Sequence, residues 1–294
     1  MNKKEFRGIY PALVTPFDAN GEIAVKPLQK LIETNIKKGV SGFYVAGSTG
    51  ESYMLTMAER KYLLEAVMDA VDGRADVIVH AGMFAEKQTI ELAQHAEKCG
   101  AAAVSSVPPF YFPFTMEEYE VYYKEIAENT GIPVIVYNIP DMSSVHFSEP
   151  DMSELLAIDG IGGMKHTSYD LFQLERLIRL WPEKNFFCGH DEIFLSALSA
   201  GADAGIGTSF NFMAEKFIEL RRLYRSNRIR EAQVLQAEAN DIISVLCKVS
   251  VFKGTKEILK LQGIDCGECR KPFLPLDEAA RQLVKETAEK YHLI

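Results

Sequence analysis

Long apolar stretches are missing from this chain of 294 residues. No run approaches the roughly 18 consecutive apolar residues that a membrane-spanning helix needs. The opening residues, MNKKEFRGIYPALVTPF, also lack the apolar segment of a secretory signal peptide. We therefore expect a protein with no membrane partner and a location in the cytoplasm.

Cysteine is scarce as well. The five cysteines are an odd number, which does not suit a disulfide framework and favours a reduced, cytoplasmic protein. Cys266 and Cys269 form a single CxxC motif in DCGECR. This motif lacks the second ligand pair of a zinc site and the strand-to-helix setting of a redox motif. We therefore interpret both cysteines as structural residues and expect no metal site.

An excess of positive charge is also absent. The chain holds 32 Lys and Arg against 41 Asp and Glu, which gives a net charge of -9, and both signs are mixed along it. A nucleic-acid-binding protein would carry a basic stripe, so we expect no nucleic-acid partner. A small anionic substrate remains compatible with this composition, because a local pocket can be positive in an acidic protein.

Short β-rich runs alternate with helical patterns from residue 9 to about residue 226. The eight runs are IYPALVTPF, GFYVAGS, ADVIVHAG, AAAVSSVPP, PVIVYNIP, IGGMKHTS, NFFCGHD and ADAGIGTS. Between them apolar residues recur at spacings of three and four, as in LQKLIETNIKKG. Eight βα units predict an α/β fold, and closure into a (β/α)8 TIM barrel is its simplest topology.

The rest of the chain shows mostly helical patterns, in IREAQVLQAEANDIISVL, KGTKEILKL and DEAARQLVKETAEKYHL. No linker or low-complexity segment separates these helices from the preceding units. We expect a barrel over residues 1–226 and a C-terminal helical extension over residues 227–294. A barrel of this length is routinely one domain, so the extension is expected to pack on it within a single domain.

Barrel enzymes place their sites at the carboxyl ends of the strands, in the loops that lead to the helices. In this chain the polar residues at those places are Ser48, Thr49, Tyr137, Lys165, Thr167, Asp191, Glu192 and Thr208. Polar residues also resume naturally wherever a buried strand ends, so this placement alone does not distinguish a site from a surface.

The alternation of side chains along a strand predicts where Lys165 in GGMKHTS points. Successive side chains of a strand point to opposite faces, so Gly163, Lys165 and Thr167 share one face and Met164 and His166 share the other. If the small Gly163 faces the crowded barrel interior, Lys165 points inward near the barrel mouth. His166 then faces the helix layer as a packed structural histidine.

Tyr137 ends the preceding strand, so it is expected to meet Lys165 above the barrel. A phenol beside an amine is a plausible pair for moving protons. A desolvated lysine is expected to have a lowered pKa, which leaves free amine to attack a carbonyl and form a Schiff base. The alternative is that Lys165 forms an ion pair in the interior, and the pattern alone leaves both open.

Three further motifs carry weaker signals. In GSTGES, residues 47–52, glycines flank two hydroxyls in a turn that suits an anion, or that is simply capped by Ser48 and Thr49. In GHDEIF, residues 189–194, Asp191 is an expected N-cap of the next helix, and on the pattern alone we favour that interpretation. The aromatic PPFYFPF, residues 108–114, favours loop packing or a subunit contact.

Taken together, the motifs GSTGE, YNIP, GGMKHTS, GHDEIF, AGADAGIGTSFN and CRKPF resemble a known family in their order and spacing. It is the class I aldolase family that contains N-acetylneuraminate lyase and dihydrodipicolinate synthase. The resemblance covers nearly the whole chain. The lysine and tyrosine motifs identify the family, and GHDEIF points to its sialic acid branch.

The resemblance implies an enzyme that cleaves N-acetylneuraminate reversibly to N-acetylmannosamine and pyruvate, without a metal or organic cofactor. It implies that Lys165 forms the Schiff base with the C2 carbonyl of the open-chain sugar acid or with pyruvate. Tyr137 and Ser48 would relay protons, and Tyr111 would reach the site of a neighbouring subunit in a homotetramer. Ser48 and Thr49 would hold the carboxylate. The sugar would be bound by Thr167, Gly189, Asp191, Glu192 and Thr208.

The chain departs from the family pattern at two places. Thr208 stands where the family often has serine, and His190 occupies a variable position and is expected to point outward. The synthase carries an arginine just after its YNxP motif and usually two threonines in place of Ser48 and Thr49, whereas this chain has YNIPDMSS. Both differences favour the lyase. Other pyruvate-dependent sugar-acid aldolases, and a barrel that binds pyruvate or a sugar acid without turnover, remain alternatives.

Overall fold

The computed structural model describes residues 4–294, and each predicted β-rich run contains one strand. The strands are β1 (Gly8–Pro11), β2 (Gly42–Val45), β3 (Asp76–His80), β4 (Ala103–Ser106), β5 (Val134–Asn138), β6 (Ile161–His166), β7 (Asn185–Cys188) and β8 (Ala204–Gly207). All are buried along most of their length, as expected for parallel strands that are covered on both faces.

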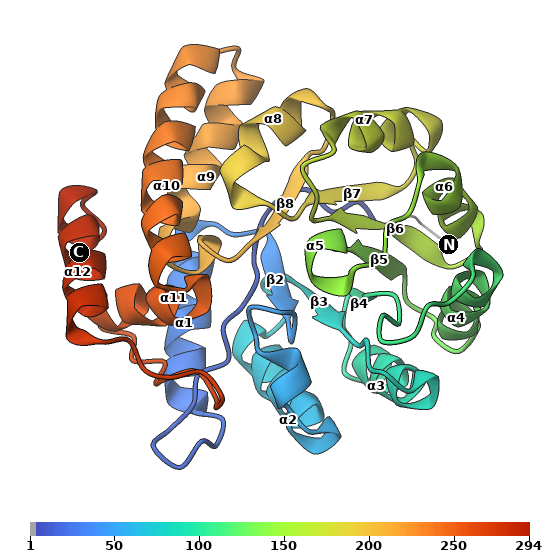
Figure 1. Ribbon diagram of the computed structural model, residues 1–294, viewed down its shortest axis with the longest axis horizontal. Helices are drawn as coiled ribbons and strands as arrows, with labels where there is room; N and C mark the ends of the chain where they lie inside the picture. The colour runs from blue at the N-terminus through green and yellow to red at the C-terminus, as the bar shows by residue number, and fades with distance from the viewer. Residues whose placement is uncertain (1–3) are drawn as a thin grey trace.

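The eight strands form one parallel sheet in the order β1-β8-β7-β6-β5-β4-β3-β2. An isolated parallel bridge between Ala12 and Tyr44 joins the two ends of this order, and Leu13 N–H donates to the Tyr44 carbonyl over 2.9 Å. The sheet therefore closes on itself, and the predicted TIM barrel is confirmed (Figure 1).

Helices follow the strands and form the outer layer of the barrel (Figure 1). They are α1 (Val25–Lys38), α2 (Met57–Val71), α3 (Glu86–Lys98), α4 (Met116–Glu128), α6 (Glu149–Ala157), α7 (Leu171–Leu180), α8 (Phe194–Ser199) and α9 (Phe210–Arg225). Capping boxes begin α2, α4 and α6, at Thr56, Thr115 and Ser148. In each box the side chains of the N-cap and N3 residues satisfy backbone N–H groups that the first turn leaves free.

Three short helical turns in the βα loops lie outside the sequence prediction. They are η1 (Ser52–Met54) after β2, α5 (Pro140–Ser143) after β5 and η2 (Asp191–Ile193) after β7. Because each follows the carboxyl end of a strand, all three stand at the mouth of the barrel.

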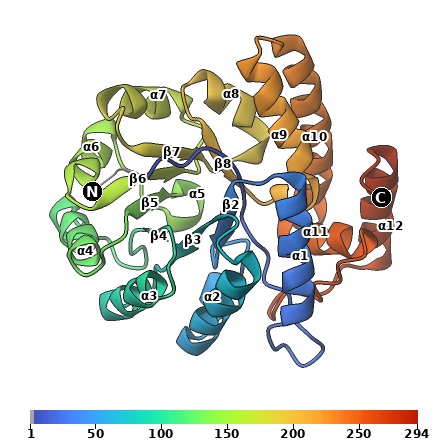
Figure 2. The same ribbon diagram turned by 180° about the vertical axis from the view of Figure 1, so that it is seen from behind.

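The C-terminal segment is helical, as predicted, with α10 (Ile229–Val249), α11 (Val251–Leu261) and α12 (Glu278–Lys290). These helices stand outside the barrel on the side of α1 and α9, as the two opposite views show (Figures 1 and 2). α10 packs on α9, and α12 packs on α10 and α11. Among residues 4–294, no helix is both long and apolar enough to cross a bilayer.

The barrel interior is a separate apolar core, distinct from the larger core between the sheet and the helices. Its members include Tyr10, Tyr44, Ile135, Tyr137, Phe187 and Ile206, which come from alternate positions of their strands. Met164 belongs to the outer core instead. From Met164 onward the two faces of β6 alternate as the sequence predicts, and side chains fill the barrel below its mouth.

A buried ion pair connects the C-terminal helices to the loop after β2. Lys256 Nζ on α11 donates to Glu51 Oε1 over 2.7 Å, and the two side chains are 3% and 1% exposed. The Arg270 backbone N–H donates to the other carboxylate oxygen over 2.7 Å. Glu51 itself adopts a left-handed backbone conformation with φ 58°, which costs a residue with a Cβ free energy. These contacts hold the loop in that conformation.

Replacing one partner of this ion pair is expected to lower the free energy of unfolding. Lys256→Met leaves the Glu51 carboxylate buried with only a backbone donor, and loss of one partner of a buried pair typically costs about 3–5 kcal/mol. We expect a fall of that size in the free energy of unfolding, measured by urea denaturation.

The control is Lys260→Met, which removes an exposed lysine from the same helix and should change the free energy by less than about 0.5 kcal/mol. In the double variant Glu51→Gln/Lys256→Met no uncompensated charge remains, so part of the loss should be recovered. A double variant at least as unstable as Lys256→Met would contradict this explanation.

Candidate active site

A cavity of about 260 Å³ opens at the carboxyl ends of the strands. Nine of the predicted site residues line it: Ser48, Thr49, Tyr137, Lys165, Thr167, Gly189, Asp191, Glu192 and Thr208. They come from the ends of five strands and the loops that follow. The fold therefore brings together in one cavity residues that the sequence separates by up to 160 positions (48 to 208).

Lys165 lies at the floor of this cavity and is 3% exposed. It is in register with Tyr137 on β5 and Phe187 on β7. Its Nζ atom lies 3.8 Å from the centre of the Tyr137 ring and 4.3 Å from that of Tyr44. Among the residues that the structure describes, no carboxylate pairs with Lys165, so the ion-pair interpretation is wrong. The faces of two aromatic rings stabilise the cation instead.

The two glycines before Lys165 allow β6 to fit between its neighbours. The pairing of β5 with β6 shifts by one residue, from Val134 opposite Ile161 to Ile135 opposite Gly163. Gly163 has φ 153°, and a Cβ there would lie 1.9 Å from the Asn185 carbonyl oxygen on β7. A side chain is therefore excluded at this position. The irregularity sets which face of the strand Lys165 occupies.

Sequence reasoning missed the side chains behind Lys165. Tyr44 on β2 packs edge-on against Tyr137, with ring centres 5.8 Å apart, and its hydroxyl donates to Ser105 Oγ over 3.1 Å. Burial, together with the neighbouring Tyr137, raises the Tyr44 pKa well above its ordinary value. The signal was present in the run GFYVAGS, because Tyr44 is an inward-facing aromatic residue near the end of a strand.

His80 is a second buried group near the lysine, and its ring packs edge-on to Tyr137 at 5.9 Å. Burial lowers its pKa well below the ordinary range, and the cations of Arg60 and Lys165 lower it further. His80 is therefore neutral at physiological pH. A neutral His80 adds no further positive charge beside Lys165.

Hydroxyl groups line one part of the cavity. Thr49 Oγ1 and Thr208 Oγ1 lie 2.7 Å apart in a hydrogen bond, and Ser48 lies beside them in the lining. The methyl group of Thr208 therefore does not keep its hydroxyl from Thr49. Among the described residues, no hydrogen bond joins Ser48 to Tyr137 directly, although both line the cavity.

Asp191 also lines the cavity, next to the chain neighbours of Thr208, and is 7% exposed. Its Oδ2 accepts a hydrogen bond from the Ser209 N–H over 2.7 Å, so the N-cap interpretation is wrong: the carboxylate bonds to the loop after β8 and not to its own helix. Burial raises the pKa of Asp191 to about 6 despite this bond. A Cβ at Gly207 would lie 2.2 Å from Asp191 Oδ1, so that position must be glycine.

The pKa of Glu192 is shifted in the opposite direction. Burial alone would raise its pKa, but hydrogen bonds from His190 and Tyr169 lower it to about 2. The Tyr169 hydroxyl donates to Glu192 Oε1 over 2.6 Å, and His190 Nδ1 lies 3.3 Å from the same oxygen. The rings of Tyr169 and His190 stack at 4.4 Å. The expectation that His190 points outward is therefore wrong: it lines the cavity.

Helix α10 holds the backbone of both acidic residues. Gln236 Nε2 donates to the Asp191 carbonyl, and Asn240 Nδ2 donates to the Glu192 carbonyl, each over 3.0 Å. No motif signalled these two amides in the sequence. The C-terminal helices thus fix this part of the cavity as well as the loop that contains Glu51.

Thr167 offers a hydroxyl without a partner. Its Oγ1 is buried and makes no hydrogen bond with the described residues. Gly189 faces it closely, since a Cβ at that position would lie 1.9 Å from Thr167 Oγ1. An unpaired buried hydroxyl is costly, so this group is available to a ligand in the cavity. His166, by contrast, is buried on the outer side, with Nε2 3.0 Å from the Asp170 carbonyl oxygen, as predicted for a packed histidine.

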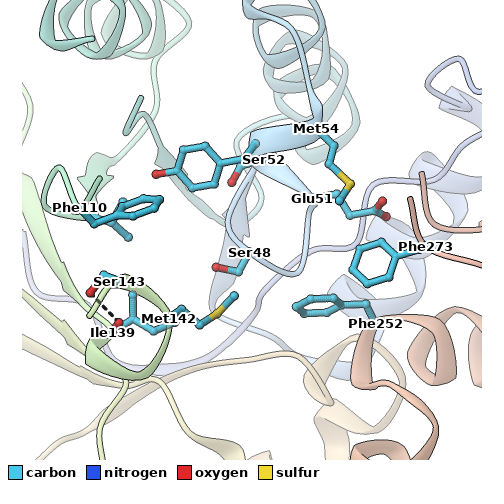
Figure 3. Close-up of a pocket in the computed structure, with 12 residues that line it drawn as sticks. Ser48, Glu51, Ser52, Met54, Phe110, Ile139, Met142, Ser143, Phe252 and Phe273 are labelled. Carbon is cyan, nitrogen blue, oxygen red and sulfur yellow. Dashed lines mark hydrogen bonds between the residues drawn. The ribbon is translucent and has the colours of Figure 1, made fainter. Parts of the chain in front are cut away.

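A second, mainly apolar cavity of about 200 Å³ adjoins the first. The two share Ser48, Ile139, Met142 and Phe252 in their linings. Figure 3 shows Ser48 between Phe110 on one side and the pair Phe252 and Phe273 on the other. The site therefore extends beyond its polar part into an aromatic recess that α5 and the C-terminal segment cover in part.

Tyr111 is the one predicted site residue that lies elsewhere. It is 76% exposed, it packs edge-on against Phe112 with ring centres 5.1 Å apart, and it lines a different cavity with Phe84 and Phe114. Within this chain it does not reach Lys165, and its place in the cavity of a second subunit stays a prediction.

The family model described as the dihydrodipicolinate synthetase family matches residues 5–291. N-acetylneuraminate lyase 2 of Escherichia coli O6:H1 is 40% identical, over 97% of this chain and 94% of that protein. The structure of CdNal from Clostridium difficile in complex with mannosamine is 34% identical, with a TM-score of 0.95, and covers 98% of this chain and 100% of its own. N-acetylneuraminate lyase from Fusobacterium nucleatum complexed with pyruvate is 35% identical, with a TM-score of 0.92 and 97% of both chains covered.

The shifted pKa of Asp191 makes stability depend on pH. A group whose pKa is raised on folding, here from 3.8 to about 6, stabilises the fold below the lower value and loses that contribution as pH rises through the higher one. Asp191→Asn keeps an acceptor for Ser209 but cannot ionise. Between about pH 3.5 and pH 7, the unfolding free energy of the wild type should fall by about 2–3 kcal/mol relative to this variant.

Urea denaturation at several pH values measures this difference. Glu192→Gln is the matched control with the opposite sign, because the lowered pKa of Glu192 contributes stability above about 4.5 that is lost as pH falls toward 2. Parallel stability curves for the wild type and Asp191→Asn across this range would contradict the assigned burial of an ionisable carboxyl.

Proposed function

We propose, from the premise that this chain belongs to the dihydrodipicolinate synthetase family, that it is an aldolase which cleaves N-acetylneuraminate reversibly to N-acetylmannosamine and pyruvate. The observation that carries the proposal is Lys165: a buried amine in contact with two aromatic rings, with no carboxylate partner among the described residues, in a cavity that hydroxyl and carboxyl groups line.

The amine provides the covalent step. The Lys165 Nζ atom attacks the ketone carbon of the substrate, and loss of water from the addition product gives a protonated imine. This cation accepts the electron pair of the bond between the α and β carbons as the β-hydroxyl gives up its proton. The aldehyde leaves, the remaining enamine takes a proton at its α carbon, and water hydrolyses the resulting pyruvate imine to restore the free amine.

Tyr137 is the proposed proton carrier for these steps. Its ring contacts Lys165, its strand position is in register with the lysine, and it lines the same cavity. Ser48 lines the same cavity but makes no direct bond to Tyr137, so we propose that the bound substrate carboxylate connects the two. This arrangement requires substrate for the relay to be complete.

The polar residues of the cavity suit the polar groups of the substrate. We propose that Ser48 and Thr49, with N–H groups of their turn, hold the carboxylate beside the ketone. Thr167, Gly189, Asp191, Glu192 and Thr208 would line the sugar chain. Ionised carboxylates accept hydrogen bonds from several hydroxyls at once, and the free Thr167 hydroxyl offers a further partner.

The same residues favour a sugar acid over the substrate of a synthase. A second substrate with a carboxylate would need a cation near the YNIP loop, but Asp141 follows that motif and lines the cavity. Its charge adds to those of Asp191 and Glu192. Three carboxyl groups in this lining suit a polyhydroxylated chain and disfavour a second carboxylate near the YNIP loop.

We also propose a cytoplasmic homotetramer in which Tyr111 reaches the cavity of a neighbouring subunit. The support is the exposed aromatic group around Tyr111, which includes Phe84 and Phe112. Exposed aromatic side chains of this density are typical of interfaces. No metal or organic cofactor is required by the proposed steps.

Borohydride trapping tests the covalent step. Reduction of an imine gives a stable secondary amine, so wild-type protein treated with pyruvate and borohydride should carry one adduct per chain, which peptide mass mapping should locate on Lys165. Lys165→Arg keeps the charge but cannot form the imine and should carry none. Failure of the wild type to form an adduct on Lys165 would overturn the mechanism.

Substrate choice is tested separately, by steady-state turnover. The wild type should cleave N-acetylneuraminate and should not condense aspartate semialdehyde with pyruvate. Glu192→Gln should lower kcat/KM for N-acetylneuraminate about 10- to 100-fold, because hydrogen bonds to charged groups are worth about 1.5–3 kcal/mol. Pyruvate trapping on Lys165 should be unchanged in this variant. The reverse substrate preference in the wild type would assign the chain to the synthase branch.

A further inference from the structure

A cluster of three metal-ligating side chains lies on the outer helix layer, away from the cavity. Glu65 is on α2, while His95 on α3 and Cys99 directly after that helix are four residues apart, so they share one face about one turn apart. Helices α2 and α3 are neighbours in both views of the fold (Figures 1 and 2). One ligand atom from each residue lies within 4.8 Å of the others.

The spacing of the donor atoms fits a tetrahedral ion. With Zn–N, Zn–O and Zn–S bonds of about 2.0–2.1, 2.0–2.2 and 2.3 Å, the N and O ligands of a tetrahedron lie about 3.3 Å apart and the N and S ligands about 3.5 Å apart. In the structure His95 Nε2 lies 3.2 Å from Glu65 Oε1 and 3.5 Å from Cys99 Sγ. Two of the distances between ligand atoms that a tetrahedral site requires are therefore already present.

The charge of the cluster also suits a divalent cation. Glu65 brings a carboxylate close to the thiol and the imidazole, and Asp69 follows it one turn later on α2. An ion bound by a carboxylate, a thiolate and a neutral imidazole would be electrically balanced. Glu65 is 53% exposed and His95 20% exposed, so an ion can enter from solvent and a water molecule can occupy the fourth position.

We propose that Glu65, His95 and Cys99 form a binding site for Zn²⁺ that links α2 to α3. Nitrogen and sulfur ligands select a borderline cation such as Zn²⁺ over Mg²⁺ or Ca²⁺, which prefer oxygen. The site has no part in the carbonyl chemistry: the chain enters β4 just after Cys99, so the cluster lies toward the amino ends of the strands, whereas Lys165 lies near a carboxyl end.

A zinc titration of the purified, metal-free protein against a chromophoric chelator tests the site. We expect one tight equivalent per chain in the wild type. Cys99→Ser and His95→Gln should each weaken binding at least about tenfold, since even changes in the outer shell of a site cost roughly 10–100-fold. Cys247→Ser is the matched control: it removes an exposed thiol near Glu192 and should leave the affinity unchanged.

Cobalt gives a second readout of the ligands. Co²⁺ added to the wild type should produce the visible absorption of a tetrahedral ion and a near-ultraviolet thiolate band, and Cys99→Ser should lose the latter. Zinc should also raise the unfolding temperature of the wild type but not of His95→Gln. An absence of saturable zinc binding would overturn the proposal, as would binding that survives Cys99→Ser and is lost in Cys247→Ser.

Discussion

The site depends on one constraint: the Lys165 amine is buried without an anion beside it. Desolvation of a lone ammonium is unfavourable, and among the described residues no carboxylate partner lowers that cost. The barrel interior provides aromatic faces instead, from Tyr44 and Tyr137. The buried His80 is neutral because its own pKa is lowered. The carboxylates of Asp191 and Glu192 bind Ser209 and the pair Tyr169 and His190 instead of the nucleophile.

The C-terminal segment holds two of the loops that line the cavity. In the loop after β2, Lys256 and the Arg270 N–H bind the carboxylate of Glu51, which has a left-handed conformation. In the loop after β7, Gln236 and Asn240 bind the carbonyls of Asp191 and Glu192. A loop on a barrel is mobile unless something outside the sheet orders it. The extension supplies that order through buried polar contacts, which are specific in geometry.

Much of the barrel could be predicted from the sequence. Apolar residues recur with different spacings in strands and in helices, and eight strand–helix units in succession leave few possible topologies. The inward position of Lys165 and its pairing with Tyr137 followed from alternation and strand order alone. The contacts of Gln236 and Asn240 could not be predicted, since they join residues more than 40 positions apart through packing that leaves no local pattern. Asp191 was misread as a helix cap for the same reason: a capping pattern is local, whereas its true donor is the Ser209 N–H on another loop.

Asp191 and Glu192 show why two adjacent carboxyl groups are not equivalent. Glu192 receives bonds from Tyr169 and His190 and stays ionised down to a pKa of about 2, whereas buried Asp191 titrates at about 6. The charge of this pair therefore changes from one to two as pH rises through the Asp191 pKa. Glu192 already has two donors on one oxygen, while Asp191 has a single backbone donor on Oδ2 and packs its other oxygen against Gly207. Glu192 is thus fixed before a ligand arrives, and the ionisation state of Asp191 decides whether its carboxyl group also offers a hydrogen-bond donor or only acceptors.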